Sequence, residues 1–409
     1  MQHHTEQVEV ASVVAATPAV GRGQLVPFVG YQLLTFGQFT ANIWILWLTY
    51  RGLSLAEIGL AESCYHLGRL VLTVPTGAFA DAFGRKWSLV AGAALAAVAT
   101  GLLWWSPGFW VICLALALDG GAGAFKLGAD QAYLFDTLKR ESRDNTFARV
   151  FAAVLAASYV AAALAGWLGA WLSDRSFAWP FALALGAALL ATVLAAFLPE
   201  PPAASEGRTV RGLFRLVADG TRIARARPNL LRLIVFSSAF WTAFTLGNLY
   251  MQSSLKAFGF PNGNIGFALG VAGMLGAGAI WIGGRVPGRW RSWAVFAGLS
   301  AAVAIGTAAQ GAALVPFVLA GLAGRECVAG LMEPLLATRL NDETPSEVRA
   351  TVLSFTEMGF SLLMMPLFPL IGWLADRGGW GLGYGAIAAG LVAATLLVLP
   401  LRGGTTKAA

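Results

Sequence analysis

Charged residues are scarce in this chain of 409 residues, at 12% of the sequence. A soluble globular protein carries about 25% charged and about 45–50% apolar residues. Here 57% of the residues are hydrophobic and the mean hydropathy is +0.68. So few charged side chains cannot cover the surface of a soluble fold of this length. A lipid bilayer is the alternative solvent, and each helical span through it needs about 20 apolar residues.

Histidine and cysteine are scarce as well. Of three histidines, only His66 lies beyond the first few residues. Three cysteines, Cys64, Cys113 and Cys327, lie in apolar stretches without metal-site spacing, so we expect small buried side chains. Without a nucleophile–base set or a ligand cluster, the sequence predicts no enzyme, no metal site and no cofactor.

Long apolar segments dominate the chain. They lie at about 26–49, 55–79, 87–107, 109–137, 146–172 and 177–198, and then at about 230–255, 262–284, 292–310, 312–338, 347–374 and 380–401. They predict an all-α integral membrane fold of twelve transmembrane helices in two six-helix halves, 26–198 and 230–401. The tails 1–25 and 402–409 are expected to flank them.

The segment 199–229 is predicted to be a basic linker between the halves. Its arginines are spaced among leucine, phenylalanine, valine and isoleucine. This pattern suits an amphipathic helix on an anionic membrane surface, and a solvated linker fits it equally well. The tail 1–25 is expected to be disordered.

The 28 lysines and arginines are distributed unevenly between the two sides of these spans. Most lie on the side of both termini. Those on the opposite side are Arg51, Arg175, Lys256 and Arg377, and those within spans are Arg69, Lys126 and Arg325. This bias predicts cytoplasmic termini. The net charge of +7 therefore reflects topology rather than nucleic-acid binding. We expect a monomeric, multi-pass protein of the inner (cytoplasmic) membrane, embedded in the lipid bilayer.

The two halves repeat short motifs about 200 residues apart. The repeated motifs are WLSDR at 171–175 and WLADR at 373–377, Ile58-Gly59 and Ile265-Gly266, and Gly84-Arg85 and Gly288-Arg289. Duplicated halves related by an axis along the membrane normal are a transporter architecture, with the substrate site between them near the midplane.

The loop after the second predicted span reads Gly-Ala-Phe-Ala-Asp-Ala-Phe-Gly-Arg-Lys at 77–86. Glycine, three residues, aspartate, two residues, glycine and two basic residues form a pattern that resembles the cytoplasmic signature of the major facilitator superfamily. The resemblance covers about residues 26–401 and implies a secondary transporter that works by alternating access. The gating residues it implies are Gly77, Asp81, Gly84, Arg85 and Lys86, with Asp136.

Within this loop, Gly84 permits a tight turn, and Gly77 is expected to let a neighbouring helix approach closely. The second-half copy has Arg285 where the aspartate would stand. We therefore expect an asymmetric lock, carried by the first half.

The resemblance implies two contacts for the lock. Asp81 would stabilise the positive start of the eleventh span, around Ser346–Arg349. Arg85 would pair with an acid at the end of the fourth span, for which Asp136 is the candidate. Such contacts favour the outward-facing state, and a static surface salt bridge is the alternative.

Ionisable side chains in hydrocarbon cost about 2.5–3.5 kcal/mol on insertion scales and indicate a transport pathway. On the second span, Glu62, His66 and Arg69 share one helical face, as pathway residues or as a self-neutralised cluster. On the fourth span, Lys126 and Asp130 form an i,i+4 pair. This pair suits proton coupling or substrate contact, and a purely structural ion pair is the alternative.

In the second half, the adjacent Arg325 and Glu326 are expected to point in different directions. Glu333 precedes Pro334 at an expected kink. Glu357 is a lone acid deep in the eleventh span, without a sequence-local basic partner, where burial would favour its protonated form. The proton-coupling candidates are, in order, Asp130, Glu357, Glu333 and Asp119, with Lys126 beside them.

Aromatic residues are plentiful in the spans and suit a cavity for an apolar ligand, with core or lipid packing as the alternative. The cavity candidates are Glu62, Arg69, Arg325, Phe36, Tyr133, Phe240 and Trp241. Convergent polar side chains are few, which favours a hydrophobic or amphipathic substrate.

Together these features predict a proton-coupled exporter of a small molecule, such as a drug or a secondary metabolite. Its partners are that substrate and protons. The fifth span has glycines at 166 and 169 but lacks the proline that drug/proton antiporters of the family carry. A proton-linked importer of a metabolite or peptide is therefore the alternative, and a transporter-like sensor is a remote one.

Overall fold

The computed structural model of the chain describes residues 25–140, 146–200, 222, 226–312, 314–344 and 349–399. The predicted tails and nearly all of the predicted linker lie outside these residues. All regular elements of the described chain are helices, as the apolar segments predict.

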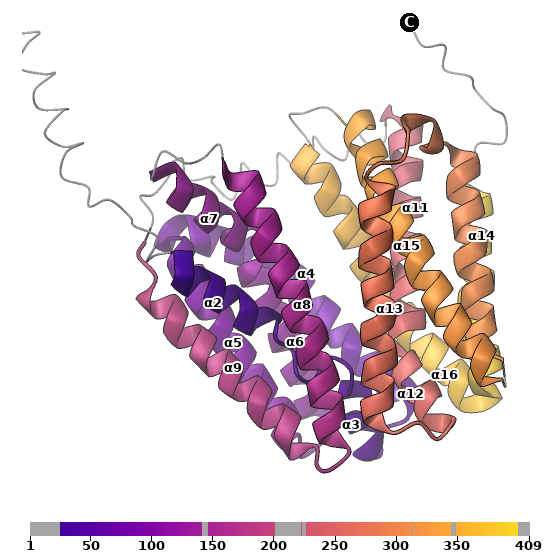
Figure 1. Cartoon of the computed structure of the whole chain (residues 1–409), viewed down its shortest axis with the longest axis horizontal. Helices are drawn as coiled ribbons and strands as arrows, with labels where there is room; N and C mark the ends of the chain where they lie inside the picture. Colours follow the sequence, from indigo (N-terminus) through magenta and orange to yellow (C-terminus); the bar gives the residue numbers. More distant parts are fainter. Residues whose placement is uncertain are drawn as a thin grey trace, which may run out of the picture.

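The helices form two bundles (Figure 1). The first contains α2 (Leu25–Phe36), α3 (Trp44–Tyr50), α4 (Leu55–Phe83), α5 (Arg85–Trp105), α6 (Phe109–Lys126), α7 (Ala129–Arg140), α8 (Phe147–Ser173) and α9 (Ala178–Phe197). The second contains α11 (Pro228–Leu249), α12 (Met251–Ala257), α13 (Asn262–Gly283), η2 (Gly288–Trp290), α14 (Trp293–Gln310), α15 (Val315–Glu343) and α16 (Arg349–Val398). α16 turns at Gly379 and so includes the eleventh and twelfth predicted spans.

Nine helical stretches of the described residues are long and apolar enough to cross a membrane. The first predicted span is divided into α2 and α3, and neither is long enough to cross alone. The count of twelve spans therefore stays a prediction, as does the cytoplasmic location of the termini.

Local sequence explains where the central helix α4 begins and ends. Glu57 N donates to Ser54 Oγ at 3.2 Å, and Ser54 N donates to Glu57 Oε2 at 2.9 Å. This reciprocal pair satisfies amides that a helix start leaves free. At the other end, Gly84 adopts φ +97°, which an L-residue with a side chain rarely does, so the chain turns there.

We call the end where α2 begins and α16 ends the termini side, and the opposite end the far side. The bundles meet on the far side and diverge toward the termini side (Figure 1). The main contacts between them are α4 with α16 and α8 with α13. One buried apolar cluster includes Ile58 and Phe368 and joins both bundles, whereas a second, around Phe28 and Tyr133, belongs to the first bundle alone.

Candidate transport pathway

A cavity of about 350 Å³ lies within the first bundle. Helices α4, α5, α6 and α9 and the α2–α3 segment line it, and Leu249 is the lining residue from the second bundle. Its ionisable lining residues are Glu62, Asp119 and Tyr65, beside Trp44 and Phe181. Among the described residues, the lining thus combines aromatic surface with two carboxyl groups and no basic side chain.

Glu62 has a weak partner within its own helix. Its Oε1 lies 3.8 Å from Nε2 of His66. His66 is buried, and neither of its ring nitrogens has a hydrogen-bond partner in the part of the chain that the structure describes. Arg69 does not complete a neutral cluster with Glu62, because its guanidinium turns to the second bundle.

Arg69 and Glu357 form an ion pair between the bundles, with Nη2 and Oε2 3.3 Å apart. We expected Glu357 to be buried, but its side chain is 60% exposed. That expectation is wrong because the bundles diverge around it, and its basic partner lies on α4. Glu333 is also exposed.

The fourth predicted span breaks between Lys126 and Asp130. α6 ends at Lys126, Gly128 adopts φ +77°, and α7 begins at Ala129. Lys126 Nζ donates to Thr35 Oγ1 at 2.7 Å, whereas Asp130 Oδ2 accepts from Gln32 at 3.1 Å. These two side chains form no ion pair in the structure. The predicted i,i+4 pair is wrong because the break at glycine removes the helical register between them.

Arg325 and Glu326 are adjacent but do not diverge as expected. Arg325 Nη2 lies 3.6 Å from Glu326 Oε1, and Arg325 is fully buried. Two groups of the neighbouring helix α11 draw both side chains the same way: Phe244 O accepts from Arg325 at 2.8 Å, and Asn248 Nδ2 donates to Glu326 at 2.8 Å. This cluster braces α15 against α11 and does not line the cavity.

Among the predicted cavity residues, only Glu62 lines the cavity. The ring of Phe36 lies 4.1 Å from Lys126 Nζ. Tyr133 is buried and its hydroxyl donates to Pro199 O at 2.9 Å. Phe240 and Trp241 pack in the apolar cluster that joins the bundles. None of these four aromatic residues lines the cavity.

On the termini side, the loop 77–86 turns tightly at Gly84, as predicted. A Cβ at Gly84 would also collide with the carboxylate of Glu200. The loop places Arg85 Nε 2.8 Å from Asp136 Oδ2, the pair that the resemblance implied. A lone ion pair of this exposure contributes little stability by itself.

Gly77 and Asp81 of the same loop are exposed. A Cβ at Gly77 would meet no atom of the described residues within 4 Å, so none of the described helices makes the predicted close approach, which stays a prediction. The expected partner of Asp81, the helix start around Ser346–Arg349, lies outside the described residues up to Arg349, where α16 begins, so this contact stays a prediction. Lys86 Nζ lies 5.3 Å from the ring centroid of Trp87.

The sequence did not reveal the role of Glu200. Its Oε1 accepts from Lys86 N at 3.4 Å, and its backbone oxygen accepts from Arg140 at 3.2 Å. The carboxylate thus lies at the start of α5, where the helix dipole favours negative charge. Burial nevertheless raises the pKa of Glu200, against the opposing effect of the Lys86 and Arg85 amides.

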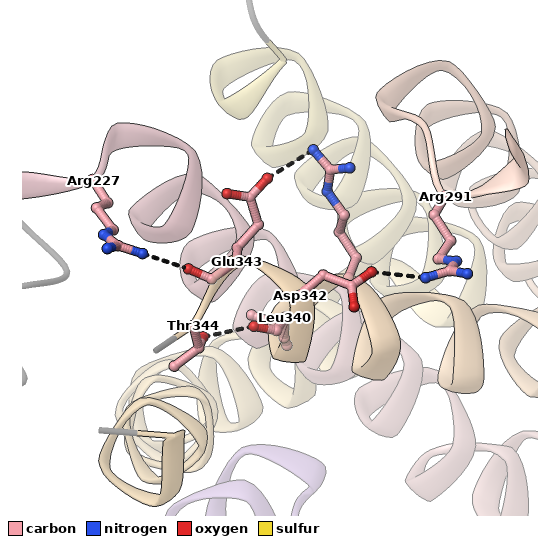
Figure 2. A network of polar contacts seen from close by, with 7 residues as sticks. Arg227, Arg291, Leu340, Asp342, Glu343 and Thr344 are labelled. Atoms are coloured by element: carbon pink, nitrogen blue, oxygen red, sulfur yellow. Dashed lines mark hydrogen bonds and ion pairs between the residues drawn. The ribbon is translucent and has the colours of Figure 1, made fainter. Parts of the chain in front are cut away.

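The second bundle has its own arginine–aspartate pair on the termini side. Arg291 Nη1 lies 2.7 Å from Asp342 Oδ2 (Figure 2). Arg291 lies as many positions after Arg85 as Asp342 lies after Asp136. Arg291, rather than Arg289, is therefore the counterpart of Arg85 in the second half. Arg285 instead folds back onto Trp281, donating to its carbonyl at 2.7 Å. Only the aspartate of the loop, and not the ion pair, is confined to the first half.

A sequence profile of the Major Facilitator Superfamily matches residues 28–365. The chain belongs to this superfamily. It is therefore a multi-pass membrane transporter and not an enzyme. No curated protein sequence matches it.

Solved structures of other superfamily transporters share the fold. A mutant of the nucleoside transporter NupG is 12% identical, with a TM-score of 0.79 over 92% of this chain and 98% of that one. A D-xylose–proton symporter is 16% identical, with a TM-score of 0.69 over 93% and 97%. A POT family transporter in complex with a conjugated peptide is 12% identical, with a TM-score of 0.67 over 94% and 98%. At these identities the likeness concerns the fold alone.

In this superfamily transporter, the ionisable side chains of the described spans divide by what they contact. Glu62 and Asp119 face the cavity. Arg69 and Glu357 link the bundles. A third group, Lys126, Asp130, Arg325 and Glu326, contacts side chains or carbonyls within its own bundle, and Glu333 is exposed. Of these three groups, the first lines the cavity, where a small molecule could reach it without displacing a partner from another helix.

Proposed function

We propose that the protein exports a hydrophobic or amphipathic small molecule in exchange for protons, across the inner membrane and by alternating access. The cavity supports this proposal best. Glu62 and Asp119 share it with Trp44, Tyr65 and Phe181, and none of the described basic residues lines it. A carboxylate in apolar surroundings is costly unless a proton or a cation neutralises it. Proton and substrate can therefore compete for the same carboxylates.

This proposal moves proton coupling from Asp130 and Glu357 to Asp119 and Glu62. Asp130 accepts a hydrogen bond from Gln32, and Glu357 is paired with Arg69. Entry of one proton yields about 2.3 kcal/mol per 100 mV of membrane potential. Protonation of a cavity carboxylate would bias the two-state equilibrium of the bundles by its different interaction with each state.

The second candidate is a proton-linked importer of a small metabolite. Its support is that the similar folds include, by its name, a D-xylose–proton symporter. The cavity also has hydroxyl and amide groups, from Thr35, Gln38, Thr40 and Thr100. The two candidates differ in the direction of substrate movement relative to the proton.

Everted membrane vesicles with an imposed inside-acid pH gradient distinguish the candidates. A panel of hydrophobic amines and neutral aromatic compounds is added, and collapse of the gradient is followed with a fluorescent amine. Export predicts collapse by at least one compound. Absence of collapse, together with uptake of labelled compound by whole cells, would support import.

The cavity assignment is tested by Glu62→Gln and Asp119→Asn at matched expression. We expect each to reduce compound-dependent proton release at least tenfold, because a neutral amide cannot exchange a proton. Glu343→Gln is the control, since Glu343 pairs with Arg339 one turn along α15 and lies outside the cavity. Wild-type coupling in both cavity variants would refute the assignment.

A further inference from the structure

The far side of the transporter contains the same contact twice, once at each junction of the bundles. At the α8–α13 junction, Asn262 N donates to Asp174 Oδ1 at 2.7 Å and Gly263 N donates to Oδ2 at 2.8 Å. Asp174 follows the end of α8 in the first bundle, and α13 begins at Asn262 in the second. One carboxylate thus bridges the first two amides of a helix that belongs to the other bundle.

The α4–α16 junction repeats this geometry with the bundles exchanged. Leu55 N donates to Asp376 Oδ1 at 3.2 Å, and Ala56 N donates to Oδ2 at 3.0 Å. Asp376 lies on α16 of the second bundle, and Leu55 and Ala56 are the first residues of α4 in the first. Free amides and the helix dipole make both helix starts attractive to a carboxylate.

The two kinds of repeated motif, the one that contains the aspartate and the Ile-Gly pair, meet in this contact. Asp174 and Asp376 are the aspartates of WLSDR and WLADR, and each faces a helix that carries the repeated Ile-Gly pair. The glycines of these pairs permit close packing: Gly266 contacts Ala170 and Gly59 contacts Pro369, with no room for a Cβ. The internal duplication has therefore produced a paired contact between the bundles.

The arginine of each motif leaves its aspartate free for the partner helix. Arg175 Cζ lies 4.0 Å from the ring centroid of Trp171, and Arg377 Cζ lies 4.3 Å from that of Trp373. Each guanidinium thus stacks on the tryptophan one turn back in its own motif. Neither arginine forms an ion pair with the neighbouring aspartate in the described structure.

The hydrogen bonds between the two bundles are absent from the termini side of the described structure. Across the described residues, the hydrogen bonds that join the two bundles lie on the far side or, like Arg69–Glu357, at mid-depth. We propose that Asp174 and Asp376 form a paired latch that holds the far side closed, and that both must leave the helix starts they cap before the transporter opens there. The functional consequence depends on the alternating access proposed above, but the closure itself does not depend on substrate or protons.

Electron paramagnetic resonance distances test the latch without any substrate. Spin labels are placed at Gly108→Cys and Leu314→Cys, exposed positions in far-side loops of the first and second bundles. The background lacks Cys64, Cys113 and Cys327, and the protein is in lipid nanodiscs. We expect Asp174→Ala and Asp376→Ala each to raise the ratio of long to short distances, roughly five-fold, as for loss of one helix cap.

The structure also predicts an order among the variants. Asp174→Ala should have the larger effect, because its hydrogen bonds are shorter and partly buried, and because Pro261 provides no side-chain cap for α13. α4 retains its own cap, Ser54, when Asp376 is removed. The double variant should shift the distances most.

Glu57→Gln is the matched control, because Glu57 contacts the same helix start as Asp376 but only within the first bundle. It should leave the distances unchanged. If the alanine variants do not purify as folded protein, leucine variants are measured instead, because leucine has a similar side-chain volume but cannot accept a hydrogen bond from the helix start. An unchanged distance distribution in the folded double variant, or an equal shift in Glu57→Gln, would overturn the latch. The distances are measured without substrate, so a failure of the latch can be distinguished from a failure of the proposed proton-coupled export, which the proton-release assay tests.

Discussion

At the scale of single residues, the partner of a charged group decides what the group can do. Glu326 is held by Arg325 and Asn248, so its charge contributes to packing of the second bundle. Asp119 instead faces the cavity with Glu62. Both acids were visible in the sequence. Their different roles were not, because the partner of Glu326 on α11 lies 78 residues away in the chain.

Gly84 allows a test of backbone strain at the termini-side loop. We expect Gly84→Ala to destabilise the fold by about 1–3 kcal/mol, because φ +97° with ψ 161° is a backbone conformation that is costly for a residue with a Cβ. The measurement is the apparent melting temperature in detergent.

Gly101→Ala is the matched control for this substitution. Gly101 lies inside α5, and a Cβ there would meet no described atom within 4 Å. Alanine is favoured over glycine in a helix interior by up to about 1 kcal/mol, so the melting temperature should stay the same or rise. Equal melting temperatures for both variants would contradict the strain assigned to Gly84.

At the scale of helices, the apolar runs predicted the long α-helices of the described residues, because this signal is local, but they did not predict the short 3-10 helix η2. The interruption of the fourth span was missed. Gly128 gives no sign in the sequence that it adopts a positive φ, and a continuous helix would have paired Lys126 with Asp130. Glu200 was missed for a different reason: it contacts the start of α5, 114 residues earlier.

The two arginine–aspartate pairs on the termini side differ in how exposed the aspartate is, which predicts different coupling energies between the paired side chains. Asp136 is 14% exposed and Asp342 is 56% exposed. We expect a double-mutant cycle of Arg85→Gln with Asp136→Asn to give about 1 kcal/mol. The cycle of Arg291→Gln with Asp342→Asn should give less than about 0.5 kcal/mol, since solvent screens the exposed pair.

These cycles are measured by chemical unfolding in mixed micelles, with all four proteins of each cycle at the same ionic strength. Raising the salt concentration should reduce the second coupling energy further. A coupling energy for Arg291 and Asp342 equal to that for Arg85 and Asp136 would show that exposure does not control these pairs.

At the scale of the whole molecule, the sequence repeat predicted two related halves but not how they touch. The repeated motifs meet across the junctions rather than within one half, so the latch needs both copies. On the termini side the bundles diverge (Figure 1), and each is braced internally by its arginine–aspartate pair. This arrangement is closed on the far side and suited to admit substrate from the termini side.

Site-directed labelling of Gln38 tests alternating access around the cavity most directly. Gln38 lines the cavity and its side chain is exposed. In the background without Cys64, Cys113 and Cys327, Gln38→Cys is treated with a membrane-impermeant maleimide in everted vesicles and in spheroplasts. We predict reaction from the termini side only, and reaction from the far side once Asp174→Ala and Asp376→Ala are added. Reaction from the far side with the latch intact, or from neither side in either protein, would contradict the account.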